Sequence, residues 1–563
     1  MSSRSISLFD KKSFASTFTP ETGHVGVVAL VSIAVVLPMV FWGVPSANDL
    51  SNHFRFALPF YDALQNGHLY PGWLAETNHG LGDPSFRFYP PALYYMLAAA
   101  RALSGNWYAA TVATFGTLSM MGALGMYLWA REFTSSQNAM WAGIFYAVAP
   151  YHLNQLFQAL MLAEFAGAAL LPFAFLFVER VCRHRRRRDI AGLAVSFALL
   201  LLTHLPLAII GSIALSFYAL LRTDRKKVVS TMSALATSVG VGLAASACYW
   251  VTMLFELRWI HGNDINPEPG IDYRANFVLS TFSSDFINVW WMNILLLVTI
   301  MMFWPALILA TRAARRNESD SNRSVIVASA MLLSLTLFMA TPLSRPLWNL
   351  VRPLQETQFP WRWFSITSMV ASLLLAQSLP FWTRLAKTTK RPIVMLAVGT
   401  MVISFAFSIS HIIREARWLT PAQFEQRLSD LRGSQSIHFW LPVWAHEPLP
   451  KTSAPVDAGD RVIEINSWMP EKRSFRASSG NASEARIQTF FYPHWRATAS
   501  GQNLTTRAND QGLLLVELPP QAATVQLEFH EPTRTRVARA INIAGIVLIG
   551  LLVAPISLKK RIR

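Results

Sequence analysis

The sequence is short of charged residues and of cysteine. Of its 563 residues only 14% are Asp, Glu, Lys or Arg, whereas soluble proteins carry about 25%. Two cysteines, Cys182 and Cys248, are too few for a disulfide framework, which excludes a small disulfide-stapled secreted protein. The hydrophobic share of 52% and the mean hydropathy of +0.32 instead indicate an integral membrane protein with several spans.

Motifs of several common enzyme classes are also missing. The chain has no Walker A motif, no HExxH, no CxxC and no GxSxG, so the local signatures of P-loop, zincin, dithiol and α/β-hydrolase chemistry are lacking. It also lacks DxD, the usual signature of enzymes that bind a nucleotide-sugar through a metal. We therefore predict no metal ligands and no cofactor, while a requirement for a divalent metal is left open.

The positive charge is concentrated in a few places. Five clusters beside long apolar runs account for the whole net charge of +17. They are residues 179–189, 222–227, 312–323, 384–391 and 559–563. Basic loops flanking spans are typical of the cytoplasmic side of a membrane. The excess is thus a topology signal, and we expect no nucleic-acid partner.

A long polar stretch near the C-terminus differs from these loops. Residues 414–534 carry 13 basic and 13 acidic residues, so we expect them on the opposite, extracytoplasmic side. The strings ARIQTFFYPHWRATA, LLLVEL and TVQLEF are typical of strands separated by turns. This stretch predicts a small β-sandwich before the last span.

The apolar runs predict a mainly α, polytopic membrane helix bundle with 11–13 spans. The run 190–221 begins and ends at basic clusters, so it crosses an even number of times, and Pro206 breaks it into two short helices. This arrangement puts His204 near the outer face, and Glu164 lies at the outer end of the preceding span. Of the runs 90–103 and 108–130, one is expected to be too short to cross. The predicted segments are a cytoplasmic N-terminus 1–24, a transmembrane domain 25–413 with a first outer loop 45–89, a β-rich domain 414–535, a final span 536–558 and a basic tail 559–563.

The first outer loop is the richest place for chemistry. On a helix, Asp49, Asn52 and His53 share one face. A carboxylate beside an imidazole is suited to act as a general base. The alternative is that Ser46 and Asp49 form a capping box, in which Asp49 only closes the start of a helix.

Several strings resemble a known family. NDLSNHFRF, NHGLGDPSFRFYPPALYY, LAEFAGAALLPF, LTHLP and LQETQFPWRWFS look like the bacterial membrane-protein family labelled 6-pyruvoyl-tetrahydropterin synthase-related. Pterin synthases themselves are small soluble zinc enzymes, and nothing in this sequence supplies their fold or a His cluster with metal spacing. The architecture is instead similar to the C-type glycosyltransferases, and FFYPHWRATASGQ with the following span is similar to the C-terminal module of related bacterial enzymes.

The resemblance implies a set of site residues. In C-type glycosyltransferases an acid of the first outer loop acts as base on the acceptor, and Asp49 matches that position. Substrate-binding roles are expected for Asn52, His53, Glu164, His204, Arg274 and Arg362. The two arginines would bind the lipid phosphate, since guanidinium groups make bidentate contacts to phosphate. Each residue has a structural alternative: an interfacial anchor or ion pair for the arginines, an intramembrane pair for Glu164 and a buried structural histidine for His204.

The expected function is an inverting glycosyltransferase of the bacterial inner membrane with its active site on the extracytoplasmic side. Its partners would be membrane lipids, a polyprenyl-phosphate-linked sugar as donor, and a glycan, lipid or protein as acceptor. Two alternatives are a non-catalytic protein that binds or flips lipid-linked glycans, and an envelope assembly factor whose β-domain binds a partner.

Overall fold

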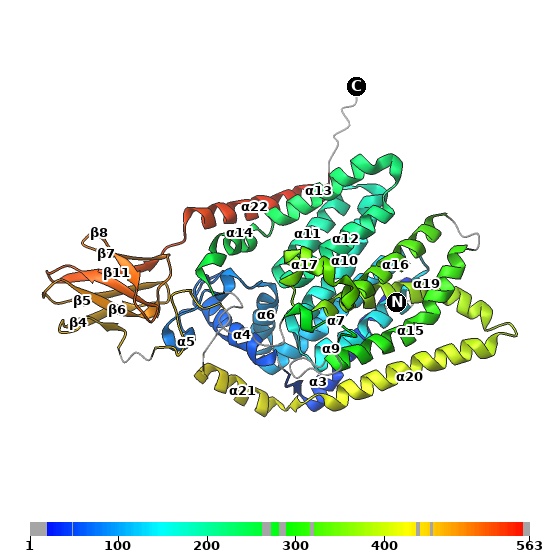
Figure 1. Cartoon of the computed structure of the whole chain (residues 1–563), viewed down its shortest axis with the longest axis horizontal. Coiled ribbons are helices and arrows are strands. Elements are labelled where there is room, and N and C mark those ends of the chain that lie inside the picture. The colour runs from blue at the N-terminus through cyan, green and yellow to red at the C-terminus, as the bar shows by residue number, and fades with distance from the viewer. Residues whose placement is uncertain are drawn as a thin grey trace, which may run out of the picture.

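The computed structural model describes residues 20–47, 49–261, 272–280, 289–315, 320–434, 440–450 and 454–555. The first 19 residues of the predicted N-terminal segment and the predicted basic tail 559–563 lie outside these ranges. Helices form a large bundle, and most of the strands gather into a separate sandwich at one end of it (Figure 1). The chain is thus mainly α with a β-domain near its C-terminus, as the composition and the strand patterns predicted.

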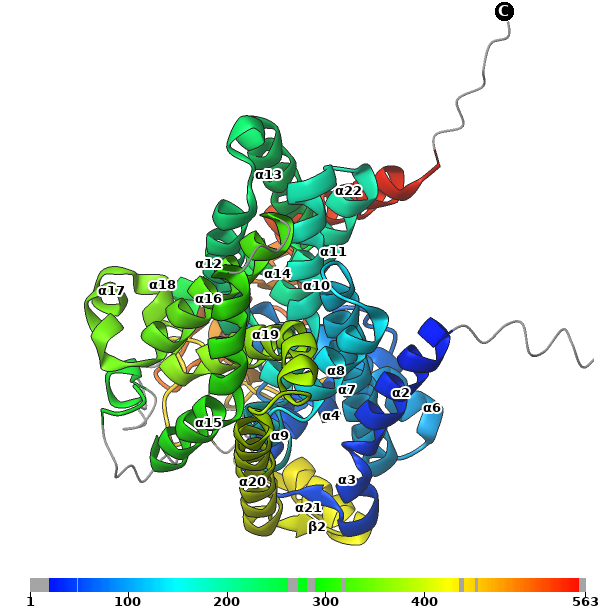
Figure 2. The same ribbon diagram turned by 90° about the vertical axis from the view of Figure 1, so that its right-hand side faces the viewer.

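Long helices make up the bundle (Figures 1 and 2). They are α2 Pro20–Ala34, α7 Trp107–Arg131, α10 Leu162–His184, α11 Arg187–Thr203, α12 Leu205–Arg222, α13 Val228–Ala244, α15 Val289–Arg315, α16 Asp320–Ala340, α19 Phe364–Leu385, α20 Arg391–Glu415 and α22 Thr533–Val553. Shorter helices fill the spaces between them and build the loops. They are α3 Leu37–Trp42, α4 Leu50–Gln65, α5 Thr77–Gly80, α6 Ala92–Ser104, α8 Ser136–Ala147, α9 Pro150–Phe157, α14 Ala247–Glu256, α17 Arg345–Leu350, α18 Arg352–Gln355 and α21 Pro421–Ser434.

Nine helical segments within the described residues are long and apolar enough to cross a membrane. This count within the described residues is below the 11–13 spans expected. The predicted run 190–221 breaks between Thr203 and Leu205 into α11 and α12, as Pro206 indicated. The predicted incomplete run is α6, whose 13 residues extend only about 20 Å at the helical rise.

Two of the basic loops, 179–189 and 222–227, meet at one end of the bundle. Arg222 donates from Nε and Nη2 to Glu179 at 2.9 and 2.7 Å, joining the end of α12 to α10. Arg187, at the start of α11, donates from Nη2 to the carbonyl oxygen of Leu551 at 2.7 Å. The last turns of α22 therefore lie beside the α10–α11 turn, at the end away from the sandwich (Figure 1).

The β-domain is a sandwich of two antiparallel sheets with one apolar core. The sheets have the strand orders β3-β6-β10-β9 and β4-β5-β11-β7-β8. The strands are β3 Val456–Asp457, β4 Ile463–Trp468, β5 Lys472–Ala477, β6 Ser483–Phe490, β7 Trp495–Ala499, β8 Gln502–Leu504, β9 Thr506–Ala508, β10 Leu513–Leu518 and β11 Ala523–Phe529. Along β11 buried and exposed residues alternate strictly, which gives Val525, Leu527 and Phe529 to the core.

The first outer loop also contributes to that core. The indole of Trp73 contacts Phe529, Tyr492 and Trp495, with ring centroids 5.3, 5.8 and 5.9 Å away. Gly82 has a φ of +88°, and a Cβ there would overlap the Trp73 ring, so this turn requires glycine. The sandwich is therefore joined to the bundle through this loop as well as through the chain on either side of it.

The earlier part of the predicted 414–535 domain does not form strands of the sandwich. Here β2, Trp418–Leu419, pairs with β1, Val44–Pro45. The helix α21 then packs along α4 (Figure 1). This segment holds the start of the first outer loop against the bundle.

Candidate active site

Asp49 lies directly before α4, but its carboxylate does not cap that helix. It occupies the N-cap position without a side-chain hydrogen bond to the helix, so the capping box considered for Ser46 and Asp49 is not formed. Instead the carboxylate is hydrogen-bonded to the Asn52 side chain, and its Oδ2 lies 3.9 Å from Nε2 of His53. The three residues therefore share a face of α4, as their spacing predicted.

The environment of Asp49 favours proton uptake at higher pH than for an ordinary aspartate. Burial raises the pKa of its carboxyl, while the charge of Arg362 and the hydrogen bond to Asn52 oppose the increase. The side chain nevertheless keeps 36% of its surface exposed. A raised pKa in a reachable carboxylate is the combination that a general base needs.

His53 is held as a neutral imidazole. Its ring is buried, and burial lowers its pKa to about 3. The Nδ1 atom lies 3.0 Å from the hydroxyl of Tyr94 on α6, which in turn is hydrogen-bonded to Tyr89. The two tyrosines fix the orientation of a ring that remains uncharged beside Asp49.

Glu164 and Arg362 meet at the same end of the bundle. Glu164 stands in the first turn of α10 and Arg362 in the short 3-10 helix Pro360–Trp363 before α19. Nε of Arg362 donates to Oε2 of Glu164 at 3.0 Å. Glu164 Oε1 accepts from the hydroxyls of Tyr151, at 2.6 Å, and Ser365, at 3.3 Å. The intramembrane pair considered as the alternative for Glu164 is therefore present, and it partly neutralises Arg362.

His204 joins the cluster at the break between α11 and α12. Its Nδ1 accepts from the backbone N–H of Leu207 at 3.2 Å and caps α12, the structural use considered for it. Gly167 of α10 permits this approach, because a Cβ there would lie 3.1 Å from Cβ of His204. The Nε2 atom takes no part in the cap and stays available for a polar partner.

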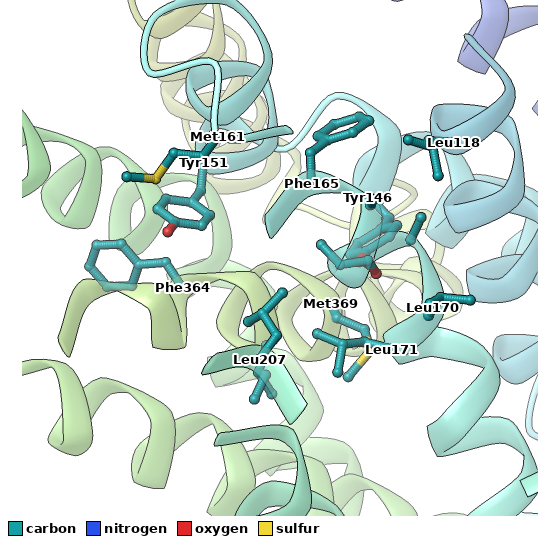
Figure 3. Close-up of a cluster of buried hydrophobic side chains, with 14 of the residues drawn as sticks. Leu118, Tyr146, Tyr151, Met161, Phe165, Leu170, Leu171, Leu207, Phe364 and Met369 are labelled. Carbon is teal, nitrogen blue, oxygen red and sulfur yellow. Dashed lines mark hydrogen bonds between the residues drawn. The ribbon is translucent and has the colours of Figure 1, made fainter. Parts of the chain in front are cut away.

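Buried apolar and aromatic side chains pack beside Glu164, which accepts from the hydroxyl of one of them, Tyr151. In Figure 3, Tyr151, Met161 and Phe364 lie on one side and Leu118 and Leu170 on the opposite side. Between them lie Tyr146, Phe165, Leu171, Leu207 and Met369. All ten side chains belong to the main hydrophobic core.

Arg274 is not brought to this cluster. Its side chain is 54% exposed and pairs with Asp272 at 3.1 Å. The neighbouring Tyr273 stacks on Trp348 of α17, with centroids 5.6 Å apart, which fixes the segment on the flank of the molecule. The sequence correctly predicted that Arg274 lies outside the spanning helices. It did not predict that Arg274 stays apart from the other candidate site residues.

Four polar neighbours of the cluster were not identified from the sequence. They are Tyr89, Tyr94, Tyr151 and Ser365. The tyrosines stand in apolar, aromatic-rich runs, where they read as an interfacial belt. Only the strings that contain them, FYPPALYY and PYHLNQLF, give a hint, because each places a hydroxyl inside a buried helix or turn.

A second buried cluster lies between the loop, α14 and the sandwich. Arg87 donates from Nε and Nη2 to Glu256 at 2.5 and 2.9 Å, and from Nη1 and Nη2 to Glu531 at 2.8 and 2.9 Å. Glu256 also accepts from Tyr492 at 2.8 Å and lies 3.0 Å from Nε2 of His494. Burial acts to raise the pKa of Glu256, but the hydrogen bonds from His494 and Arg87 outweigh it and the pKa is lowered.

The described residues contain no group of three or more His, Cys, Asp or Glu side chains that could hold a metal ion. The donor set at the Asp49 cluster is one carboxylate, two neutral imidazoles and an ion pair. Pterin synthases hold zinc, but the described residues of this chain show no corresponding group of metal ligands.

Comparison with known proteins identifies a family. Residues 86–415 match the family described as 6-pyruvoyl-tetrahydropterin synthase related domain, membrane protein. No curated protein matches the sequence. The matched segment extends from Phe86 in the first outer loop to the end of α20, and so includes Glu164, His204 and Arg362 but not Asp49.

Several solved membrane proteins are similar in structure. ArnT from Cupriavidus metallidurans, solved with bound undecaprenyl phosphate, is 13% identical, with 74% of this chain and 77% of that chain covered and a TM-score of 0.43. The archaeal oligosaccharyltransferase AglB from Archaeoglobus fulgidus is 12% identical over 71% of this chain and 56% of that one, with a TM-score of 0.48. The arabinofuranosyltransferase AftD from Mycobacteria is 16% identical over 69% of this chain and 26% of that one, with a TM-score of 0.46. At these identities the likeness concerns the arrangement of the chain alone.

Proposed function

This chain belongs to the 6-pyruvoyl-tetrahydropterin synthase-related family of membrane proteins, and we propose that it is a glycosyltransferase. It takes a sugar from a polyprenyl-phosphate carrier and attaches it to a hydroxyl group of an extracytoplasmic glycan, lipid or protein. The observation that carries the proposal is the Asp49 carboxylate, which neither caps α4 nor pairs with an arginine or lysine of the described residues at contact distance. The basic loops at the other end of the bundle support an extracytoplasmic position for it.

The reaction assigned to the site is a single displacement. The oxygen of the acceptor hydroxyl attacks the anomeric carbon of the sugar and forms the new C–O bond. The bond between that carbon and the phosphate oxygen breaks, and the polyprenyl phosphate leaves with the electron pair. Asp49 takes the proton of the hydroxyl, and because attack and departure are on opposite sides, the anomeric configuration inverts.

The neighbouring residues have supporting roles in this proposal. His53 is neutral and held by Tyr94, so it adds no charge that would lower the basicity of Asp49. Arg362 uses Nε and Nη1 for Glu164 and the carbonyl of Thr357, which leaves Nη2 for the departing phosphate. Glu164 holds the guanidinium in place, and His204 offers Nε2 to a substrate hydroxyl.

The test uses the purified full chain and a panel of synthetic polyprenyl-phosphate hexoses and pentoses. The measurement is release of polyprenyl phosphate in the presence of a cell-envelope extract, since this product forms whichever acceptor in the extract receives the sugar. Asp49→Asn is expected to lower this release by about 10²- to 10⁴-fold, the range for loss of a general base. Asp457→Asn, at an exposed position of β3 in the sandwich, is the control and should keep the full rate.

Two results would contradict the proposal. One is full release by folded Asp49→Asn protein, and the other is no release with any donor of the panel. Glycan mass spectrometry of a deletion strain and its parent then identifies the sugar. A sugar residue that is lost on deletion, and restored by the wild-type gene but not by Asp49→Asn, would name both the donor and the product.

A further inference from the structure

A seam between α4 and α21 holds three arginines along one face of α4. Arg427 donates from Nη2 to the Ser51 hydroxyl at 3.0 Å. Further along, Arg432 donates to both carboxylate oxygens of Asp62 at 2.6 and 3.2 Å. Arg55 lies between these two contacts, one helical turn after Ser51. Figure 1 shows α21 running beside α4 at the edge of the bundle.

Two of the three arginines lack a counter-ion within the described part of the chain. Asp62 neutralises Arg432, whereas the ion pairs of the described residues include neither Arg55 nor Arg427. Arg55 donates from Nη1 to the Asn52 amide oxygen at 3.4 Å, and its Nε is buried without a partner among the described residues. Burial lowers the pKa of Arg55, and the charge of Arg427 lowers it further. Two adjacent cations without an acid are stabilised when an anion binds between them.

Arg55 also lines a pocket outside the membrane-spanning helices. The pocket encloses about 680 Å³, including space open to solvent, and three parts of the molecule form it. They are α4 and α21, the first outer loop with Trp73 and Glu76, and Pro470 of the sandwich. Since no lining residue belongs to a spanning helix, the pocket suits a water-soluble ligand better than a lipid tail.

The pocket is connected to the candidate base through one side chain. Asn52 accepts a hydrogen bond from Arg55 and is hydrogen-bonded to Asp49. Arg55 follows Asp49 by six residues, a rise of about 9 Å along the axis of α4. Asn52 lies between them and links the anion site to the candidate base.

We propose that Arg55 and Arg427 bind an anionic group, a carboxylate or a phosphate, on the saccharide acceptor. The inference rests on the proposed function in calling the ligand an acceptor. It makes the α4–α21 seam, together with the neighbouring pocket that Arg55 lines, the acceptor subsite. It predicts that acidic or phosphorylated glycans are preferred over neutral ones.

Binding to the full chain in detergent tests this preference without requiring transfer. The probes are glucuronate, glucose 6-phosphate and uncharged glucose, and dissociation constants are measured by saturation-transfer NMR. The two charged sugars should bind the wild-type protein at least about tenfold more tightly than glucose, equivalent to about 1.4 kcal/mol. Arg55→Gln and Arg427→Gln should each remove most of this difference, while Arg55→Lys should retain part of it. Arg486→Gln, on the exposed face of the sandwich, is the control and should leave it unchanged.

Other outcomes separate this inference from the proposed function. Equal affinities for glucose and the charged sugars would overturn the anion site. An unchanged preference in Arg55→Gln protein with a wild-type melting temperature would do the same. If Arg55→Gln instead weakens binding of a polyprenyl-phosphate sugar and leaves glucuronate unaffected, the site belongs to the donor and the acceptor assignment is wrong. Asp49→Asn should abolish transfer but keep the preference for charged sugars, so failure of one proposal leaves the other testable.

Discussion

Arg362 and Arg87 are both buried, but they differ in the number of carboxylates that neutralise them. Arg87 pairs with two and Arg362 with one. Arg87 makes bidentate contacts to Glu256 and Glu531, and Glu256 also accepts from the Tyr492 hydroxyl and lies within hydrogen-bond distance of His494. Arg362 pairs with a single carboxylate, that of Glu164. Its charge also acts on Asp49, yet the pKa of Asp49 is raised rather than lowered. A fully paired network is suited to hold parts of a protein together, whereas a carboxylate left basic and accessible is suited to take a proton.

The largest effect is expected from a substitution that breaks the Arg87 network. Arg87→Met removes the shortest ion pairs of Glu256 and Glu531 and, among the arginines of the described residues, leaves them only the longer contacts to Arg534 and Arg539. Loss of a partner from a buried ion pair costs about 3–5 kcal/mol. We expect a lower melting temperature of the full chain and earlier proteolytic release of the sandwich. Arg486→Met, which removes an exposed pair with Asp457, is the matched control and should cost about 0–1 kcal/mol. Equal melting temperatures for the two variants would show that the Arg87 cluster does not hold the sandwich.

Acidification should separate the two networks. Asp49 must be deprotonated to act, so transfer falls by about tenfold per pH unit below its raised pKa. The pKa of Glu256 is lowered in the folded protein, so its stabilising contribution is present above the unfolded value and is lost only as the pH falls through the folded one. Transfer should therefore fail at a pH where the melting temperature is still high. The measurement is the transfer rate and the melting temperature across the same pH series, and simultaneous loss of both would contradict the distinction.

The smallest expected effect concerns the orientation of His53. Tyr94→Phe removes the hydroxyl beside Nδ1 of His53, and a neutral hydrogen bond of this kind contributes about 1 kcal/mol. We expect transfer to decrease by about fivefold with little change in melting temperature. Tyr95→Phe, one residue along α6, removes a hydrogen bond to the carbonyl of Leu69 instead and should retain the wild-type rate. Identical rates for the two variants would show that the Tyr94 contact does not matter for catalysis.

Features with a local cause were predictable from the sequence. Pro206 specifies the break between α11 and α12, and the basic residues at both ends of that run put His204 at the opposite face. The spacing of Asp49, Asn52 and His53 specifies their shared face of α4. The alternation in TVQLEF identified β11 because period-two burial has no other common explanation.

Features that depend on distant pairing were not predictable. Arg87 stands in the string SFRFYPP and reads as one more interfacial charge, because its partners Glu256 and Glu531 lie far along the chain. The position of Arg274 was not predictable for the same reason. The neighbouring apolar runs predict its side of the membrane, but its place on the molecule depends on the stacking of Tyr273 on Trp348. Periodicity reports burial of a face and gives no information on which charges meet.

The insertion of Trp73 into the sandwich means that the first outer loop can complete its folding only after the sandwich has been made. The aromatic side chains that receive it, Tyr492, Trp495 and Phe529, are made near the end of translation. The first outer loop is made early, yet Trp73 reaches these partners only after the sandwich has been synthesised. A chimera that exchanges the sandwich must therefore carry the matching loop with it.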